Sequence, residues 1–477
     1  MANGKYVQQK KRRGGSGNSM IFILAALLIF MGSMLMFKSC QNSGIPDNEG
    51  DSTQNKPSFW NPFQKPEGTE ASTIETTTAP TEPYVTSTAS VGVTGDVLVH
   101  GPLIEAAKQS DGTYDFSDLY TYIQGYYNSV DFMVANLEVT LGGEAAGKYQ
   151  GYPTFNCPDS MIDALQDAGV DMMLTANNHS YDTGHNGFIR TQEVLNEKGM
   201  AHLGTRTSED VDPYVVQDIN GIKVGMVCYT YESGRTEDGR KALNGIPVSA
   251  TDTNLVSTFS YDNLTGFYND VEQTLLAMQE EGADFTMVFI HWGQEYQLEP
   301  NSYQTSIAQM LCELGVDIIV GGHPHVIQPF STLTSTSGHQ TYCIYSVGNA
   351  VSNQRRETLE TSPNKEHTED GMLLTVEFEK WSDGRINISD INILPTWVER
   401  QTVNGKRTFT IVPLDLDRDW STYKIQSFDR LDDSYDQTMA LVGNGLNTAR
   451  EALGKEPVAL TAQPTTTEET SSERPAA

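Results

Sequence analysis

The stretch that decides the fold is VDIIVGGHPHVIQP, residues 316–329, in which an apolar run ends in two glycines and a His-Pro-His sequence. In an extended chain, residues i and i+2 project to the same side, so His323 and His325 are expected to point into one site. The glycines leave space for the backbone to turn close to an ion, and Pro324 stiffens the loop. The pattern predicts a buried strand followed by a metal-binding loop, with a structural use of the histidines as the alternative.

Further apolar runs along the chain have the same strand-like character. They cover residues 90–99, 131–139, 170–178, 223–231, 284–292 and 341–349. Patterns typical of amphipathic helices cover residues 158–168, 185–198, 264–281, 301–314 and about 422–453. Alternation of strands and helices predicts an α/β layered domain. Residues 371–379 and 386–399 have no helix between them, so they predict an antiparallel addition to a sheet.

Side chains that can bind metal follow several of the predicted strands. They are Asp96, Glu138, Asn178, His179, His291, His323 and His325. Ligands of α/β proteins bind outside the carboxyl ends of the strands, so these side chains are expected to share one site. Taken singly, each has a structural alternative: a turn at Asp96, a helix cap at Asn178, or a core histidine at His291.

The residue types at these strand ends indicate the metal. Mixed imidazole and carboxylate ligation suits Mn, Fe or Zn more than Ca or Mg. Asp96 and Glu138 supply the negative charge that two divalent ions need. Two ions about 3.5–4 Å apart can activate water and bind a phosphoryl group. The sequence therefore predicts a site for divalent ions, two in number.

The N-terminus predicts a membrane anchor. Residues 20–37, MIFILAALLIFMGSMLMF, are eighteen residues without a charge, which is enough to span a bilayer core. The basic segment 1–19 should stay in the cytoplasm by the positive-inside rule. A cleaved signal peptide and a lipoprotein modified at Cys40 are the alternatives. We expect a single-pass protein of the cell membrane, with its N-terminus cytoplasmic and its C-terminal domain extracellular.

Composition divides the remainder of the chain. Residues 38–86 and 456–477 are rich in Ser, Thr, Pro and Glu, which predicts a disordered spacer and a disordered tail. The folded domain is therefore expected over residues 87–455. No CxxC spacing occurs, and Cys228 and Cys343 lie inside apolar runs, so we expect them to be small buried hydrophobes.

The charge of the chain argues against one class of partner. The formal net charge is −31, and residues 1–38 hold six Lys or Arg and no acidic residue. The remaining residues therefore carry 25 basic and 62 acidic side chains. A body this acidic repels nucleic acid, so nucleic-acid binding is not expected.

Six short motifs, in their order along the chain, resemble one protein family. They are GDVLVHG (95–101), DFMVANLEVTL (131–141), LTANNHSYDTG (174–184), IHWGQEY (290–296), GGHPHVIQP (321–329) and YSVGNAVSNQR (345–355). They resemble the capsule-synthesis CapA, or PgsA-like, family of poly-γ-glutamate biosynthesis, which belongs to the calcineurin-like metallophosphoesterase superfamily. The resemblance implies two packed β-sheets flanked by helices and a metal centre.

The resemblance also implies roles for single residues. Asp96, Asn178, His291, His323 and His325 resemble metal ligands of the superfamily, and Glu138 takes the place of the aspartate that bridges two metals. His179 resembles the histidine that protonates a leaving oxygen. Asp182, three residues on, is expected to orient the His179 imidazole.

Two departures from the superfamily pattern concern the metal and the substrate. Leu98 occupies the histidine position of the Asp-x-His motif, so one metal is expected to be held weakly or to be absent. Asn136-Leu137-Glu138 replaces the Gly-Asp-x-x-Asp motif, which puts ordinary phosphoesterase activity in doubt. The residues assigned to substrate binding are Asn136, Glu295, Arg355 and Arg356, with a solvated surface loop as the alternative for the two arginines.

Three functions are consistent with these observations. The first is a membrane-anchored extracellular protein of capsule or poly-γ-glutamate synthesis or export, working alone or in a membrane-bound complex. The second is a secreted metal-dependent phosphoesterase that acts on nucleotides or other phosphate esters. The third is a non-catalytic partner that binds or assembles the anionic polymer. The sequence does not decide whether the protein has a hydrolase activity of the metallophosphoesterase type.

Overall fold

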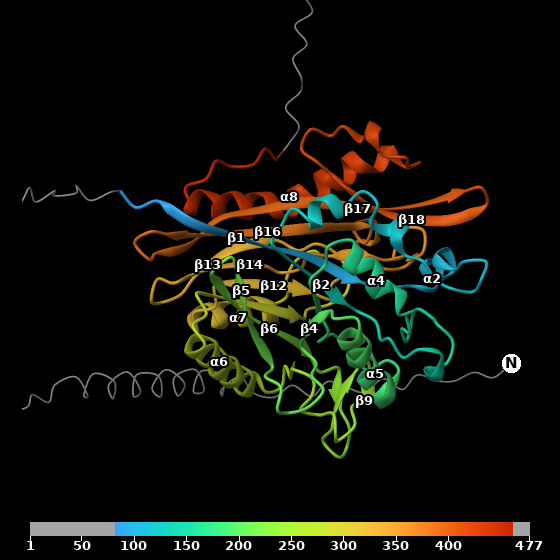
Figure 1. The fold of residues 1–477 in the computed structure, drawn as a ribbon, viewed down its shortest axis with the longest axis horizontal. Helices are drawn as coiled ribbons and strands as arrows, with labels where there is room; N and C mark the ends of the chain where they lie inside the picture. Colours follow the sequence, from blue (N-terminus) through green and yellow to red (C-terminus); the bar gives the residue numbers. More distant parts are fainter. Residues whose placement is uncertain (1–81, 461–477) are drawn as a thin grey trace, which may run out of the picture. The chain divides into compact units, whose positions relative to one another are not determined.

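A computed structural model describes residues 82–460 of the 477-residue chain. These residues form an α/β domain with two large sheets, as the strand and helix patterns predict (Figure 1). Within residues 82–460 no helix combines the length and the apolar composition that a membrane crossing requires. The predicted membrane span at residues 20–37 lies outside the described residues.

The first sheet has eight strands in the order β18-β17-β16-β1-β2-β3-β4, with β15 paired to β1. The strands β1, β2, β3, β4 and β15 run parallel, and β16 to β18 extend the sheet with antiparallel pairs. The bounds are β1 Val85–Val97, β2 Phe132–Leu137, β3 Met172–Leu174, β4 Ala201–Leu203, β15 Asn349–Val351, β16 Asp370–Trp381, β17 Ile386–Val403 and β18 Lys406–Pro413. The predicted antiparallel addition is confirmed.

The second sheet has seven strands in the order β10-β6-β11-β12-β14-β13, with β5 paired to β6. The central strands β6, β11, β12 and β14 run parallel, and β5 and β13 are antiparallel to their neighbours. The bounds are β5 Tyr214–Ile219, β6 Ile222–Tyr231, β10 Thr258–Phe259, β11 Phe285–His291, β12 Ile318–Gly322, β13 Phe330–Thr334 and β14 Gln340–Ile344.

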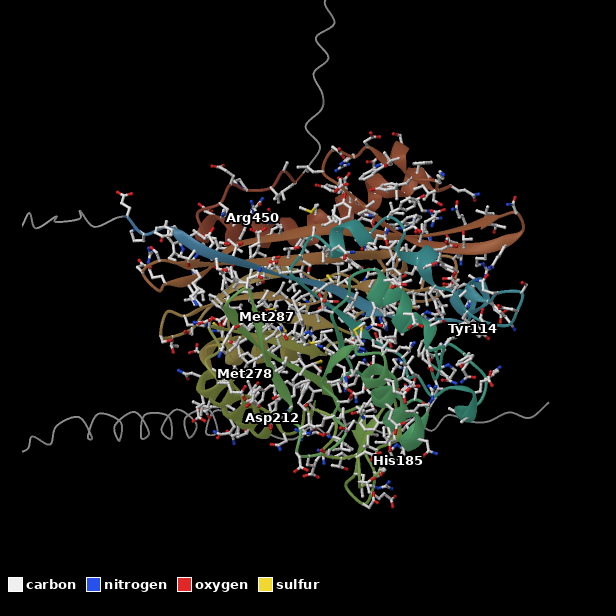
Figure 2. All side chains as sticks on the ribbon, viewed as in Figure 1. Tyr114, His185, Asp212, Met278, Met287 and Arg450 are labelled. Atoms are coloured by element: carbon white, nitrogen blue, oxygen red, sulfur yellow. The ribbon has the colours of Figure 1, made fainter. Side chains whose placement is uncertain are left out.

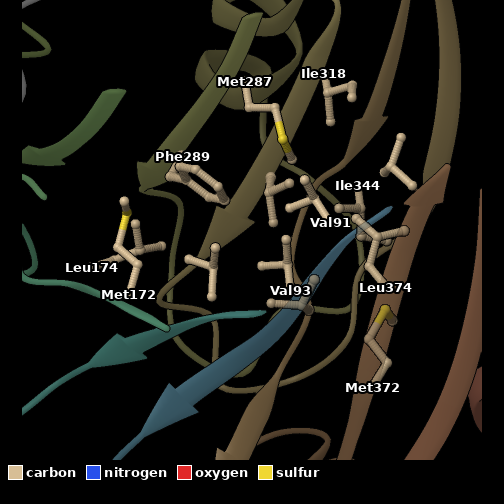
Figure 3. Close-up of a cluster of buried hydrophobic side chains, with 14 of the residues drawn as sticks. Val91, Val93, Met172, Leu174, Met287, Phe289, Ile318, Ile344, Met372 and Leu374 are labelled. Carbon is tan, nitrogen blue, oxygen red and sulfur yellow. The ribbon is translucent and has the colours of Figure 1, made fainter. Parts of the chain in front are cut away.

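Alternate residues of the strands supply the core between the sheets. Val91 and Val93 of β1 face Met287 and Phe289 of β11 in one buried cluster (Figure 3). The intervening residues of each strand point to the opposite face, because successive side chains alternate across a strand. Two sheets therefore pack through their inner faces and leave their outer faces for helices.

Helices cover the outer faces of both sheets. On the first sheet these helices are α2 Gly101–Ala107, α4 Ser160–Asp167 and α5 Gly184–Glu197, and on the second they are α6 Leu264–Glu280 and α7 Ser302–Glu313. Figure 2 shows the contrast between Met278 of α6, which packs on the outer face, and Met287, which lies in the inner core. An Asn301 capping box fixes the start of α7.

The long C-terminal helix α8, Leu431–Ala452, completes the inner core. Leu431, Tyr435 and Val442 belong to the same buried cluster as the inner strand residues. Arg450 at its C-terminal end donates to Asp390 Oδ1 at 2.6 Å and to the Ile391 carbonyl at 3.1 Å, which ties the helix to β17 (Figure 2). The sequence predicted this helix from about residue 422, several residues before it begins.

A small third sheet was not predicted. It consists of β7 Gly234–Arg235, β8 Lys241–Leu243 and β9 Ile246–Pro247. The four described cysteines are buried and unpaired, which confirms the prediction for Cys228 and Cys343.

Candidate functional site

The predicted ligands lie together because the parallel strands end at a common edge. Asp96 near the end of β1 is level with Asn136 of β2, and His291 at the end of β11 is level with Gly322 of β12. The two sheets thus each contribute their carboxyl ends to one site. The structure brings all six predicted metal ligands to this edge, and their metal-binding role stays a prediction.

The ligand atoms form two groups that share Glu138. Glu138, His291 and His323 form one group, and Asp96, Glu138 and His325 form the other. In each group the candidate ligand atoms lie within 4.8 Å of one another. Glu138 Oε1 is 3.3 Å from His291 Nε2, and Glu138 Oε2 is 3.9 Å from His325 Nδ1. One carboxylate between two groups is the arrangement that a pair of bridged ions requires.

Asn178 extends the first group. Its Oδ1 is 2.7 Å from His291 Nε2, so the amide oxygen and the imidazole nitrogen face the same point. Asn136 plays a different part: its Nδ2 donates to Asp96 Oδ1 at 2.7 Å, and its Oδ1 accepts from Asn177 Nδ2 at 3.1 Å. Asn136 therefore orients a predicted ligand, and each end of its amide is engaged by a neighbouring side chain.

Unpaired polar atoms show that the site fits a cation. Glu138 has no exposed surface, and among the described residues neither of its oxygens has a hydrogen-bond partner of acceptable geometry. The buried Nδ1 of His323 is also unpaired in the described part of the chain. A buried carboxylate without a partner is strongly unfavourable. Divalent ions would compensate these atoms.

The electrostatics of the site agree with that fit. Burial raises the pKa of Glu138 well above its usual value, and the charge of Asp96 raises it further. Burial lowers the pKa of His291 to about 3 and that of His323 well below its ordinary range. Burial opposes ionisation of Asp96, but contacts with His325 and His291 outweigh it and lower the pKa. The imidazoles of His291 and His323 are therefore held neutral, which is the form that binds metal.

The backbone of the His-Pro-His loop is strained. His323 has a φ of 95° and His325 a φ of 56°, both in the left-handed region. Such conformations cost about 1–3 kcal/mol each and persist where surrounding structure imposes them, often at functional sites. A Cβ on Gly322 would lie 3.1 Å from Asp96 Oδ1 and 3.5 Å from His291 Nδ1. The glycine therefore keeps the space between two predicted ligands open.

His179 and Asp182 form the predicted pair next to the ligands. His179 Nδ1 lies 2.7 Å from Asp182 Oδ2, and both side chains are buried. Asp182 also accepts from the Phe155 backbone N–H at 2.7 Å and from Asn244 Nδ2 at 2.8 Å. An ionised Asp182 can only accept hydrogen bonds, so the contact with His179 requires the imidazole proton to be on Nδ1. The other ring nitrogen, Nε2, is then the atom without a proton.

The residues assigned to substrate binding do not all face the site. Glu295 is exposed after β11, and its charge adds to the effect of burial, which is the main cause of the raised pKa of Tyr296. Arg355 is only 2% exposed and donates to the Val398 carbonyl at 2.6 Å and to Glu369 Oε2 at 3.1 Å.

Arg356 forms an ion pair with the same residue, Glu369. Its Nε lies 3.5 Å from Glu369 Oε1. Arg355 is thus buried and paired with an acid, which contradicts the solvated alternative for this residue. Arg356 pairs with the same acid while 31% of its side chain stays exposed. These contacts disfavour a substrate role for either arginine.

Comparison with known proteins identifies the family. Residues 90–354, more than half of the chain, match the family model described as bacterial capsule synthesis protein PGA_cap. The matched range contains every predicted metal ligand. The chain belongs to the bacterial capsule synthesis protein family. The resemblance of the six sequence motifs to the CapA family is thereby confirmed.

Two curated relatives agree with the family model. The PGA biosynthesis protein CapA of Bacillus subtilis (strain 168) is 22% identical over 360 residues, which cover 73% of this chain and 85% of the relative. The capsule biosynthesis protein CapA of Bacillus anthracis is 25% identical over 268 residues, 54% of this chain and 59% of the relative. The solved structure of TT1561 of Thermus thermophilus covers 60% of this chain and 94% of that chain at 8% identity, with a TM-score of 0.29, and supports no conclusion.

The sequence patterns did not identify two residues of the candidate site in this member of the capsule synthesis family. Asn244 reaches Asp182 from the turn between β8 and β9. Asn349 begins β15, is level with Asp96 of β1, and has its Oδ1 3.1 Å from His325 Nδ1. Asn349 lies in the YSVGN motif, and the Gly-Asn sequence resembled a turn; its position after an apolar run was the available signal.

Proposed function

We propose that this chain is a membrane-anchored extracellular protein of capsule or poly-γ-glutamate synthesis or export, and that its domain holds two divalent ions. The observation that carries the proposal is Glu138, a buried carboxylate without a hydrogen-bond partner among the described residues. It is shared by a group with His291 and His323 and a group with Asp96 and His325. The names of the two curated relatives supply the polymer. The chemistry of the donor set favours Mn, Fe or Zn.

The donor set divides between the two ions. Asp96, Glu138 and His325 would hold one, and Glu138, Asn178, His291 and His323 would hold the other. Ions at such a site polarise an acyl or phosphoryl oxygen and lower the pKa of water. His179, held by Asp182, is the residue placed to give or take a proton beside them.

Metal ions also resolve an electrostatic difficulty. The chain beyond residue 38 carries 62 acidic and 25 basic residues, and it should repel a polyanion. Arg355 and Arg356 are paired with Glu369 and do not offset this charge at the site. The divalent ions would then be the local positive charge that an anionic polymer or a phosphate ester meets.

A specific observation favours a second function, hydrolysis of a phosphate ester. His179 directly follows Asn178, a predicted ligand, and Asp182 holds its Nδ1 at 2.7 Å, an arrangement that would suit a general acid. Turnover of a simple aryl phosphate that Asp96→Ala abolishes would support this function. The third function, non-catalytic binding or assembly of the polymer, predicts no such turnover.

The anchoring part of the proposal rests on residues 20–37 and on the spacer 38–86, which would place the domain 87–455 outside the membrane. A membrane-bound synthesis or export complex is the proposed partner. Protease treatment of intact cells tests the topology. The domain should be cleaved while the basic segment 1–19 is protected, and a protected domain would contradict the proposal.

The function itself is tested in cells whose own copy of this gene is deleted. We expect the wild-type chain to restore surface polymer and His323→Ala, at equal protein level, to leave it at the deletion level. A second variant, Asn387→Ala on an exposed part of β17, serves as a control that restores the polymer. Full polymer with His323→Ala would overturn the metal-dependent function and favour the non-catalytic one.

A further inference from the structure

The group around Asp96 has fewer protein ligands than the group around His323. The Asp-x-His motif of the metallophosphoesterase superfamily would supply a histidine two residues after Asp96, where this chain has Leu98. Leu98 is 1% exposed and packs in the outer hydrophobic cluster, so its side chain contributes nothing to the site. The structure shows another polar group on this side of the site.

That group is the amide of Asn349. The strand β15 pairs in parallel with the end of β1, and Asn349 is the register partner of Asp96. Its Oδ1 lies 3.1 Å from His325 Nδ1, and Asp96 Oδ2 lies 3.3 Å from the same nitrogen. Neighbouring ligand atoms of a six-coordinate ion with bonds of about 2.1 Å are about 3 Å apart. The separations therefore suit three ligands of one ion.

The surroundings fix which end of the amide faces the site. Asn349 is 1% exposed, and its Nδ2 lies 3.2 Å from the His325 carbonyl, 3.1 Å from Gln354 Oε1 and 3.1 Å from the Thr368 carbonyl. Backbone carbonyls are acceptors only, so a flipped amide would place its oxygen against oxygens. Oδ1 must therefore face His325 Nδ1 and the carboxylates.

We propose that Asn349 supplies, through Oδ1, a fourth protein ligand to the ion held by Asp96, Glu138 and His325, in place of the histidine that Leu98 replaces. The inference rests on the proposed metal centre. A neutral amide oxygen is a hard donor that suits Mn²⁺ and Fe²⁺. The ion would be held by an amide from the edge of β15, and its affinity would not require a second histidine on β1.

Mn²⁺ binding by the full chain tests the proposal, measured by equilibrium dialysis and elemental analysis. We expect two ions per wild-type chain. Asn349→Ala should keep one at wild-type affinity and bind the other at least about tenfold more weakly, since even indirect partners of a ligand contribute about 10–100-fold. Asn349→Asp should bind this ion more tightly than Asn349→Ala does, because one carboxylate oxygen replaces Oδ1, although the other oxygen cannot donate the hydrogen bonds of Nδ2.

The alternative is that Asn349 only holds loops through its Nδ2. Asp cannot donate those hydrogen bonds, so in that case Asn349→Asp would lose the ion as completely as Asn349→Ala, which overturns the proposal. Gln354→Leu removes one acceptor of Nδ2 and is the matched control, expected to keep both ions. If Asn349→Ala does not fold, Asn349→Asp and this control decide the question.

Asp96→Ala distinguishes failure of the Asn349 assignment from failure of the proposed metal centre. If Asp96→Ala loses an ion while Asn349→Ala binds two at wild-type affinity, the Asn349 assignment is overturned and the metal centre stands. If neither substitution changes the bound metal, the metal centre is overturned, and the Asn349 assignment is overturned with it.

Discussion

Glu138 is the residue on which the proposed metal site depends. It follows β2 directly, has no exposed surface, and lies between His291 and His325. Its elevated pKa reflects burial first and the charge of Asp96 second. Without cations this carboxyl is unfavourable in its ionised form, and a bound cation reverses that balance. With the proposed ions bound, the residue should therefore stabilise the protein, and without them it should destabilise it.

Glu138→Gln should separate these two effects. In chelator, the free energy of unfolding should rise by about 1–3 kcal/mol, because the variant removes a buried carboxyl that must either stay ionised without a partner or take up a proton. With Mn²⁺, the stabilisation that the ions give the wild type should be lost. Urea unfolding with and without metal measures both changes. An equal metal response in the wild type and the variant would contradict the shared-ligand role.

His179→Ala should affect turnover and not metal content. Its imidazole is held by Asp182 and packs against the Phe155 ring, with ring centroids 4.8 Å apart. General acid–base catalysis contributes typically about 10²–10⁴-fold, so we expect an activity loss of that size with two ions still bound. Elemental analysis beside an aryl phosphate assay checks this. Loss of an ion would instead make His179 a ligand.

At the scale of elements, the strand ends were predictable and the connections were not. Long apolar runs such as 284–292 and 316–323 identified β11 and β12, and the rule for parallel strands then placed His291 and His323 together. The strands β7 to β9 are two or three residues long and carry no periodicity, so Asn244 could not be placed. The partner of Arg355 is Glu369, and no local pattern links those two residues.

Arg355→Met tests whether this arginine is structural. It joins the loop after β15 to Glu369 and to the Val398 carbonyl, and its guanidinium lies 5.3 Å from the Trp397 ring centroid. Breaking a buried ion pair costs about 3–5 kcal/mol, and Arg430 still neutralises Glu369, so we expect about 3 kcal/mol. Urea unfolding measures the loss. Unchanged stability with lost surface polymer would support substrate binding instead.

Asp370, which joins β16 to α8, predicts that the stability of the folded protein depends on pH. Burial raises the pKa of Asp370 well above its usual value, although Ser434 Oγ donates to its Oδ1 at 2.6 Å and opposes the shift. The folded protein thus binds more protons than the unfolded chain above pH 3.8, and stability falls as pH rises toward the folded pKa.

Asp370→Asn should therefore stabilise the protein at pH 7 by about 1 kcal/mol or more, and this gain should shrink as the pH approaches about 4. Thermal unfolding across that range, in chelator, is the measurement. The control is Asp383→Asn in an exposed turn, which should change stability little at neutral pH. A gain from Asp370→Asn that grows as the pH falls would contradict the assignment.

At the scale of the whole molecule, the candidate site is built from the strand ends of two sheets, which come from different parts of the chain. Asp96, Glu138 and Asn178 come from the first sheet, and His291, His323 and His325 come from the second. The inner core that holds the sheets together therefore also sets the distances between the ligands. This division explains why the sequence predicted the ligand types but not Asn349, which reaches the site only because β15 returns to the first sheet.

The central claim is that Glu138 is shared by two ions, and anomalous diffraction from crystals of the Mn²⁺-loaded protein tests it most directly. We expect two anomalous peaks flanking the Glu138 carboxylate, one beside Asp96 and His325 and the other beside His291 and His323. A single peak, or no peak within bonding distance of Glu138, would contradict it.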